Sequence, residues 1–360
     1  MMRPTGVWRE VARNIRSGTT RTLLLATASI VVGSVLVLVD IGDVRQLLDE
    51  AETYQRSGAA TLTLVAPGRV DGESCAALER VDGVLEAGAI RQSTDTLKAV
   101  ALPDAPLSTF EVTPDFPGIL TDSRSLAGGV VVSRDVANTL GVQVGEAFAE
   151  RNGTANVTGV FDYPSDGRRP GFGWAALIRS NYELPFDECW AYAWPQQPEL
   201  RALLTATLTP AVQGADDDPP QVAQLNASLG WQFGGSDRLT YRMTGYSPLI
   251  ASLFAVVLAA VAIRLRRLEI ASNLHAGAMR RDVISMMLAE SASWAVPAAV
   301  ITTAITLIIS APVASGDRTA LIIEGLKTPI GLITGTLVGT LIATALVHER
   351  HLFVYFKERR

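Results

Sequence analysis

Side chains that carry out catalysis or bind metals are few in this 360-residue sequence and lie far apart in it. The two cysteines are Cys75 and Cys189, whereas the three histidines, His275, His348 and His351, all lie in the last third of the chain. A catalytic serine or cysteine needs a base within hydrogen-bond reach, and two cysteines alone supply too few ligands for a zinc site. The sequence therefore predicts neither a catalytic residue nor a metal site.

Lysines in the position that binds nucleotide phosphates are also absent from the sequence. A Walker A loop carries a lysine directly after a glycine. The three lysines here, Lys98, Lys327 and Lys357, follow leucine, leucine and phenylalanine. We therefore expect this chain to bind no cofactor, and any ATP and Mg²⁺ that drive it to be bound by a separate partner subunit.

The remaining sequence contains four long stretches without any Asp, Glu, Lys or Arg. They cover residues 22–39, 243–263, 291–316 and 328–347. A helix needs roughly 20 residues to cross a hydrocarbon core of about 30 Å. The sequence therefore predicts an α-helical membrane protein with four transmembrane helices in a one-plus-three layout. The long polar segment between the first and second helices is expected to form an extracytoplasmic α+β domain.

Arginines are concentrated before the first span, between the second and third spans, and after the fourth. By the positive-inside rule both termini and the middle loop are cytoplasmic, and residues of about 40–245 are extracytoplasmic. We therefore expect a multi-pass protein of the plasma membrane. Because the arginines flank apolar spans, they indicate contact with membrane lipid and not with nucleic acid. Residues 8–15 place Trp8 and Val11 among arginines, as an interfacial amphipathic helix does.

This layout divides the chain into nine segments. They are a cytoplasmic amphipathic N-terminal helix (1–21), transmembrane helix 1 with a stalk (22–56), the extracytoplasmic domain (57–235), a stalk with transmembrane helix 2 (236–265), a cytoplasmic loop with a short helix (266–284), transmembrane helix 3 (285–312), a short extracytoplasmic loop (313–327), transmembrane helix 4 (328–348) and a cytoplasmic tail (349–360).

The first stalk carries an apolar stripe, and the extracytoplasmic domain alternates strand and helix patterns. Val44, Leu47 and Leu48 recur at helical spacing, and we expect them to pack on residues 238–246.

Within the extracytoplasmic domain, strands are predicted at 61–65, 85–90, 129–133, 146–151, 154–161, 175–178 and 189–194, and helices at 73–81, 134–140 and 199–208. Asn152-Gly153 predicts a hairpin turn, Ser133 an N-cap and Gly141 a helix end. Residues 216–220 are expected to form a loop.

Both cysteines fall within the predicted extracytoplasmic domain. Thiols oxidise outside the cytoplasm, so that Cys75 and Cys189 are expected to form a disulfide. Such a bond would stabilise the domain by roughly 4 kcal/mol on the chain-entropy estimate. The alternative is two unrelated buried thiols.

The loop between the second and third spans carries a distinctive pattern of charged and small residues: Arg266, Arg267, Glu269, Ile270, Gly277, Ala278, Arg280, Arg281, Asp282, Val283 and Glu290. These residues match the pattern R-R-x-E-I-G-x-x-R-A-L-G-A-x-R-R-D-I, with a later glutamate that opens the next helix. The loop thereby closely resembles the cytoplasmic loop of MacB/FtsX-type (type VII) ABC transporter permeases. Residues 8–25 and 129–161 also resemble the family, and residues 163–168 and 188–190 resemble a subgroup found in high-GC Gram-positive bacteria.

The resemblance implies that this loop forms a coupling helix, which docks into a groove on an ATP-binding subunit. The expected contact residues are Glu269, Leu274, His275, Arg280 and Arg281. The alternative is a membrane-surface helix whose arginines face lipid headgroups. The family also works as a dimer whose first two helices form the central seam, for which we select Ser29 and Gly33. Gly331, Gly335 and Gly339 recur every fourth residue and are expected to pack against another helix of the same chain.

The implied function is that of a non-catalytic permease subunit. It would couple ATP hydrolysis by two copies of a separate cassette subunit to movement of its extracytoplasmic domain. That movement would export a peptide, antibiotic or lipid, or control an envelope protein, and the permease would pair with itself or with a related permease. The alternatives are an extracytoplasmic sensor or scaffold that is not coupled to ATP, and a membrane-anchored enzyme, for which the sequence offers no catalytic cluster.

Overall fold

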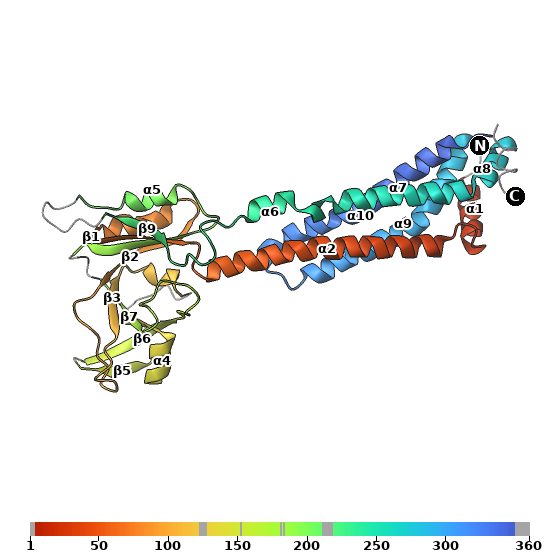
Figure 1. The fold of residues 1–360 in the computed structure, drawn as a ribbon. Helices are drawn as coiled ribbons and strands as arrows, with labels where there is room; N and C mark the ends of the chain where they lie inside the picture. The colour runs from red at the N-terminus through yellow and green to blue at the C-terminus, as the bar shows by residue number, and fades with distance from the viewer. Residues whose placement is uncertain are drawn as a thin grey trace. The chain divides into compact units, whose positions relative to one another are not determined.

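The computed structural model describes residues 4–121, 128–151, 153–180, 182, 184–210 and 219–349. The chain forms two compact units. One contains Met1–Leu48 and Gly235–Arg360 and is called the helical unit, and the other contains Asp49–Gly234 and is called the sheet unit. The predicted insertion of one domain between the first span and the last three is confirmed (Figure 1).

The helical unit contains the predicted one-plus-three set of long helices. Within the described residues, four segments are long and apolar enough to cross a membrane: Thr22–Arg56, Gly235–Leu265, Arg280–Ser310 and Gly316–Leu346. The helices of this unit are α1 (Pro4–Arg16), α2 (Thr22–Arg56, which continues into the sheet unit), α6 (Gly235–Tyr241), the 3₁₀ turn η3 (Met243–Tyr246), α7 (Ser247–Leu265), α8 (Arg267–His275), α9 (Arg280–Ser310) and α10 (Ser315–Leu346).

Two parts of the helical unit differ from the sequence expectation. Val44 and Leu48 of the α2 stripe pack on the α9–α10 hairpin, in a cluster with Leu321 and Val313. Leu47 and one side of Val44 face the expected counterpart, across a hollow that residues 237–239, 241 and 242 also line. The expected loop over 313–327 is largely helical, since α10 already begins at Ser315. Charges at 317, 318, 324 and 327 end an apolar span but do not break a helix, so the uncharged stretch underestimates the length of α10.

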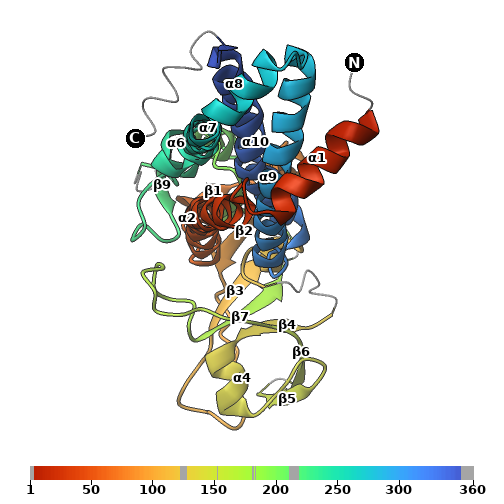
Figure 2. The same ribbon diagram turned by 90° about the vertical axis from the view of Figure 1, so that its right-hand side faces the viewer.

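A glycine stripe holds α7 and α10 together. A Cβ atom on Gly331, Gly335 or Gly339 would overlap the backbone of α7 at Pro248, Ser252 or Val256. Opposite them α7 presents three fully buried alanines, Ala251, Ala255 and Ala259. The two helices therefore pack backbone to backbone within one chain, as the spacing predicts. They run side by side in both views of the unit (Figures 1 and 2).

The sheet unit contains a nine-stranded mixed sheet in the order β5-β6-β4-β7-β3-β2-β8-β1-β9. Its strands are β1 (Thr61–Val70), β2 (Val84–Gln92), β3 (Ser108–Val112), β4 (Val130–Ser133), β5 (Ala147–Glu150), β6 (Gly153–Phe161), β7 (Ala175–Arg179), β8 (Phe186–Ala193) and β9 (Gln221–Gln224). The pairs β3–β7 and β4–β6 are parallel and the other pairs are antiparallel.

Short helices cover parts of this sheet. The α-helices are α3 (Gly72–Ala77), α4 (Arg134–Leu140) and α5 (Leu200–Thr205), and the 3₁₀ turns are η1 (Leu78–Arg80) and η2 (Phe116–Ile119). α4 packs on β4 and β6, whereas α3 and α5 contact β8 and the strands beside it. The predicted α+β fold is confirmed, although the sequence analysis missed β3 and β9.

The finer predictions for the sheet unit are mostly confirmed. β5 and β6 form the expected hairpin, although its turn residue Asn152 lies outside the described residues. Gly141 ends α4 in a left-handed conformation with a φ of 65°. Ser133 stands at the N-cap of α4, but its hydroxyl makes no capping hydrogen bond and instead accepts from the backbone N–H of Ala175 at 3.4 Å. Part of the predicted loop at 216–220 lies outside the described residues.

A disulfide joins Cys75 of α3 to Cys189 of β8, as expected, with a Cα–Cα distance of 5.8 Å. Both residues are buried in a core with Phe186, Leu200 and Leu204. The bond therefore fixes α3 to β8 of the sheet.

Candidate functional site

The loop that resembles the coupling helix lies at one end of the helical unit, beside α1 (Figure 1). α8 buries Ile270 and Ala271 against Met286 and Met287 of α9 and Val11 of α1. This packing leaves one side of α8 and the turn that follows it on the surface. The short helix is therefore held in place by apolar contacts with two neighbouring helices.

The turn between α8 and α9 is tight and exposed. Gly277 has a φ of +89°, which favours glycine, and a Cβ at this position would meet no atom within 4 Å. The backbone N–H groups of Ala276 and Ala278 donate to the carbonyls of Ser272 and Asn273. The last orphan carbonyls of α8 are thereby satisfied.

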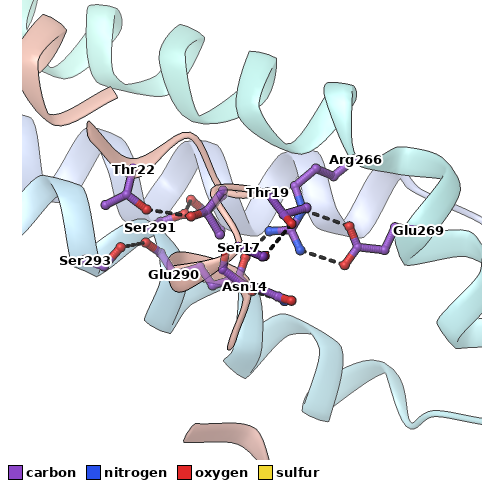
Figure 3. A network of polar contacts seen from close by, with 11 residues as sticks. Asn14, Ser17, Thr19, Thr22, Arg266, Glu269, Glu290, Ser291 and Ser293 are labelled. Atoms are coloured by element: carbon purple, nitrogen blue, oxygen red, sulfur yellow. Dashed lines mark hydrogen bonds and ion pairs between the residues drawn. The ribbon is translucent and has the colours of Figure 1, made fainter. Parts of the chain in front are cut away.

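An ionic network joins this loop to three other helices, α1, α7 and α9 (Figure 3). Arg266 lies between α7 and α8, donates to both carboxylate oxygens of Glu269 at 3.0 and 2.7 Å, and forms an ion pair with Glu290 of α9. Asn14 of α1 donates to the other oxygen of Glu290 at 2.8 Å. Glu290 is only 4% exposed. One buried carboxylate thus connects α1, the α7–α8 junction and α9.

The electrostatics of this network keep Arg266 charged. Burial by itself lowers the pKa of the Arg266 guanidinium, but its hydrogen bonds to Glu269 and Glu290 outweigh burial and raise that pKa overall. A paired charge of this kind is expected where an ionisable group lies next to an apolar span. The network is therefore suited to fixing the helices, and Arg266 stays protonated within it.

The five residues predicted to contact an ATP-binding subunit differ in their exposure and in their contacts within the chain. His275 and Arg281 are exposed at the turn between α8 and α9. Leu274 packs partly into the core beneath α8. Glu269 is 38% exposed and is held by Arg266, and Arg280 donates to the carbonyls of Ala345 and Val347 at the end of α10.

Arg280 is thus bound within the chain, where its positive charge lies at the negative end of α10. Of the five predicted contact residues, His275, Arg280 and Arg281 are exposed, and Arg280 alone among these three donates to carbonyls at the end of α10.

Asn14, Arg266 and Glu290 were not selected as site residues from the sequence. Arg266 and Glu290 stand just outside the uncharged stretches 243–263 and 291–316. A charge at the edge of a span requires a partner of opposite charge. The positions of Arg266 and Glu290 could therefore have predicted the ion pair between them. Nothing in the sequence identifies Asn14 as the third member, because only the packing of α1 on α9 brings it there.

Ser29 and Gly33, the residues predicted for a dimer seam, are buried within their own chain, and the seam itself stays a prediction. Ser29 is 1% exposed within its own chain. A Cβ on Gly33 would meet Leu332 of α10 and Thr302 of α9 at 2.7 Å. Small residues allow close approach to any neighbouring helix, and the neighbours here are α9 and α10 of the same chain.

A second ionic cluster lies in the helical unit near the α9–α10 turn. Arg242, between α6 and η3, donates to Asp40 of α2 at 3.1 Å and to Glu324 of α10 at 2.8 Å. Lys327 donates to Glu324 at 2.6 Å, and Asp40 is 2% exposed. Ionic clusters therefore tie the helices at two places in the unit. Among the described residues no group of three His, Cys, Asp or Glu side chains is placed to hold a metal ion.

Comparisons with known proteins add a distant likeness. No protein-family model matches the sequence, and a search of the curated proteins finds no match. Among solved structures, the chain is similar to the periplasmic region of MacB from Actinobacillus actinomycetemcomitans. The similarity covers 42% of this chain and 82% of that chain, with 8% sequence identity and a TM-score of 0.30. At this TM-score the likeness decides nothing, and the fold rests on the helices and strands described above.

Proposed function

We propose that this chain is the permease subunit of an ABC transporter of the MacB/FtsX type. It couples ATP hydrolysis by a separate cassette subunit to movement of its sheet unit on the other side of the membrane. The arginines around the loop 266–284 favour a cytoplasmic position for that loop. The Cys75–Cys189 disulfide favours an oxidising compartment for the sheet unit.

The observation that carries this proposal is the way α8 is attached. A short helix that transmits force needs a free face for its partner and rigid connections to the spans. α8 ends in an exposed turn with His275, Met279 and Arg281, beside a hollow of about 430 Å³. Its other side is joined to α7 and α9 through Arg266 and Glu290. A membrane-surface helix would need no such connections.

The contacts of the helical unit then give a route for the movement. A shift of α8 acts on α7 and α9 through Arg266 and Glu290. The glycine stripe passes a shift of α7 to α10, since their backbones touch. At the second cluster, Arg242 connects α2 and α10 to the segment that leads into α7. α2 and α6 are the elements that lead to and from the sheet unit.

The partners in this proposal follow from the resemblance of the loop. Two copies of a cassette subunit bind ATP and Mg²⁺, and the permease pairs with a second copy of itself or with a related permease. The moving domain exports a peptide, antibiotic or lipid, or controls an envelope protein. Residues 163–168 and 188–190 favour the subgroup of high-GC Gram-positive bacteria within this family.

Co-purification tests the proposal. The tagged full-length chain is extracted from its native membrane in a mild detergent, and co-eluting proteins are quantified by mass spectrometry. We expect a near-stoichiometric ATP-binding cassette subunit. The variant H275A/R281E should retain about a tenth of it or less, because an exposed charge facing a complementary partner is reversed.

The control variant is R80E, which reverses an exposed arginine on the sheet unit and should retain the cassette subunit fully. Equal retention by both variants would show that the α8–α9 turn is not the docking site. If no cassette subunit elutes with the unaltered chain, the transporter proposal fails. The chain would then be a sensor or scaffold that works without ATP.

A further inference from the structure

A cavity of about 800 Å³ opens in the helical unit between the start of α2, the end of α7 and α9. Its apolar wall is formed by the side chains of Leu24, Leu25, Leu258, Val261 and Trp294. Leu24 is 64% exposed, although it belongs to an uncharged span. In a bilayer such a wall faces acyl chains.

The polar side of the same cavity is basic. It is lined by Arg21, Arg264, Arg266 and Arg267 against only two acids, Glu269 and Glu290. Arg266 forms ion pairs with both of these acids. In the part of the chain that the structure describes, the side chains of Arg21 and Arg264 have no hydrogen-bond or ion-pair partner. Two unpaired cations therefore stand at a cavity whose opposite wall is apolar.

The backbone adds to this positive side. Arg21 directly precedes α2, and Leu24 of the first turn also lines the cavity, so the N-terminus of α2 lies beside it. The first N–H groups of a helix have no partner within that helix. Arg21 itself has a φ of 50°, an uncommon conformation for a residue other than glycine. Amides and guanidinium groups together favour a phosphate.

We propose that this cavity is a binding site for one anionic phospholipid. The phosphate pairs with Arg21 and Arg264, and the acyl chains lie along Leu24, Leu258 and Val261. A free phosphate or a nucleotide would leave the apolar wall uncovered, and a zwitterionic lipid would bring a second cation to the arginines. This site does not depend on the proposed transport function, because its formation needs no ATPase partner.

Native mass spectrometry of the delipidated full-length chain in detergent tests the site. Phosphatidylglycerol, phosphatidylcholine or inorganic phosphate is added in separate titrations. We expect one phosphatidylglycerol per chain to remain bound at concentrations at which phosphatidylcholine does not. The variant R21Q/R264Q should bind phosphatidylglycerol roughly thirtyfold more weakly, as expected for the loss of two arginine contacts.

Three further variants separate the site from general attraction and from misfolding. R9Q/R16Q removes two arginines of α1 that do not line the cavity, and it should keep the affinity within about threefold. V261W keeps every charge but fills the cavity with an indole, and it should lose the lipid. R21K/R264K retains both charges and should restore most of the binding.

Three results would overturn the proposal. Equal losses in R21Q/R264Q and R9Q/R16Q would mean diffuse attraction to the membrane surface. Inorganic phosphate that displaces the lipid at equal concentration would mean a site for a soluble anion. Lipid bound to monomers but absent from every dimer would mean that a second copy of the chain fills the cavity.

Discussion

Glu290 is the residue on which the inner network of the helical unit depends. It accepts hydrogen bonds from Asn14 and Arg266, and it is buried. Its loss leaves a buried guanidinium with only Glu269 as partner, which typically costs about 3–5 kcal/mol. We expect E290A to lower the thermal midpoint of the purified chain by several degrees.

The double variant E290A/R266A should cost less than the sum of its two single variants, because the two residues share one interaction. The matched control is E10A, which breaks an exposed pair with Arg13 and should change stability by less than about 0.5 kcal/mol. Equal effects of E290A and E10A would show that the buried network does not hold the helices.

At the scale of whole helices, the close packing of α7 on α10 can be tested by adding one methyl group at the contact. A Cβ at Gly335 overlaps the carbonyl oxygen of Ser252, so G335A must push the two backbones apart. We expect a loss of about 1–3 kcal/mol. G316A serves as the control in the same helix, since a Cβ there meets nothing within 4 Å. It should be neutral or stabilising by about 0.5–1 kcal/mol. Thermal unfolding in detergent gives both values, and a harmless G335A would contradict the contact.

Helices and strands were predicted correctly from the sequence where a single local pattern determines their conformation. Uncharged stretches located the four spans, alternation located β1, and the Asn152-Gly153 turn signal located β5 and β6. β3 and β9 were missed because Ser108–Val112 and Gln221–Gln224 are short and carry polar side chains. Their strand conformation comes from pairing with neighbours that are distant in the sequence.

The candidate site shows the same limit. The sequence located the α8–α9 turn, but it could not separate exposed His275 from inward-facing Leu274. That distinction depends on which side of a short helix meets α9. The contact of Gly33 with α9 and α10 was not predicted for a related reason, because a small residue indicates that another helix approaches closely but does not identify that helix.

The division into two compact units predicts how the whole molecule unfolds. The Cys75–Cys189 bond closes a loop with a sequence separation of 114 within the sheet unit. Its removal should destabilise that unit by roughly 5 kcal/mol on the chain-entropy estimate for a loop of this length. We expect C75S/C189S to shift only the transition reported by Trp190, which packs in the sheet core. The helical transition, followed by circular dichroism, should not move. A common shift of both transitions would show that the units unfold as one.

The contact of α7 with α10 also restricts how the helical unit deforms. Three successive glycines place backbone against backbone over two turns, and no flexible side chain lies between them to absorb a displacement. In kinematic terms the two helices are one rigid rod, so sliding α7 along α10 would require the glycine and alanine surfaces to separate first. The internal degrees of freedom of this unit therefore reside in the tilt and rotation of α2 and α9 about that rod.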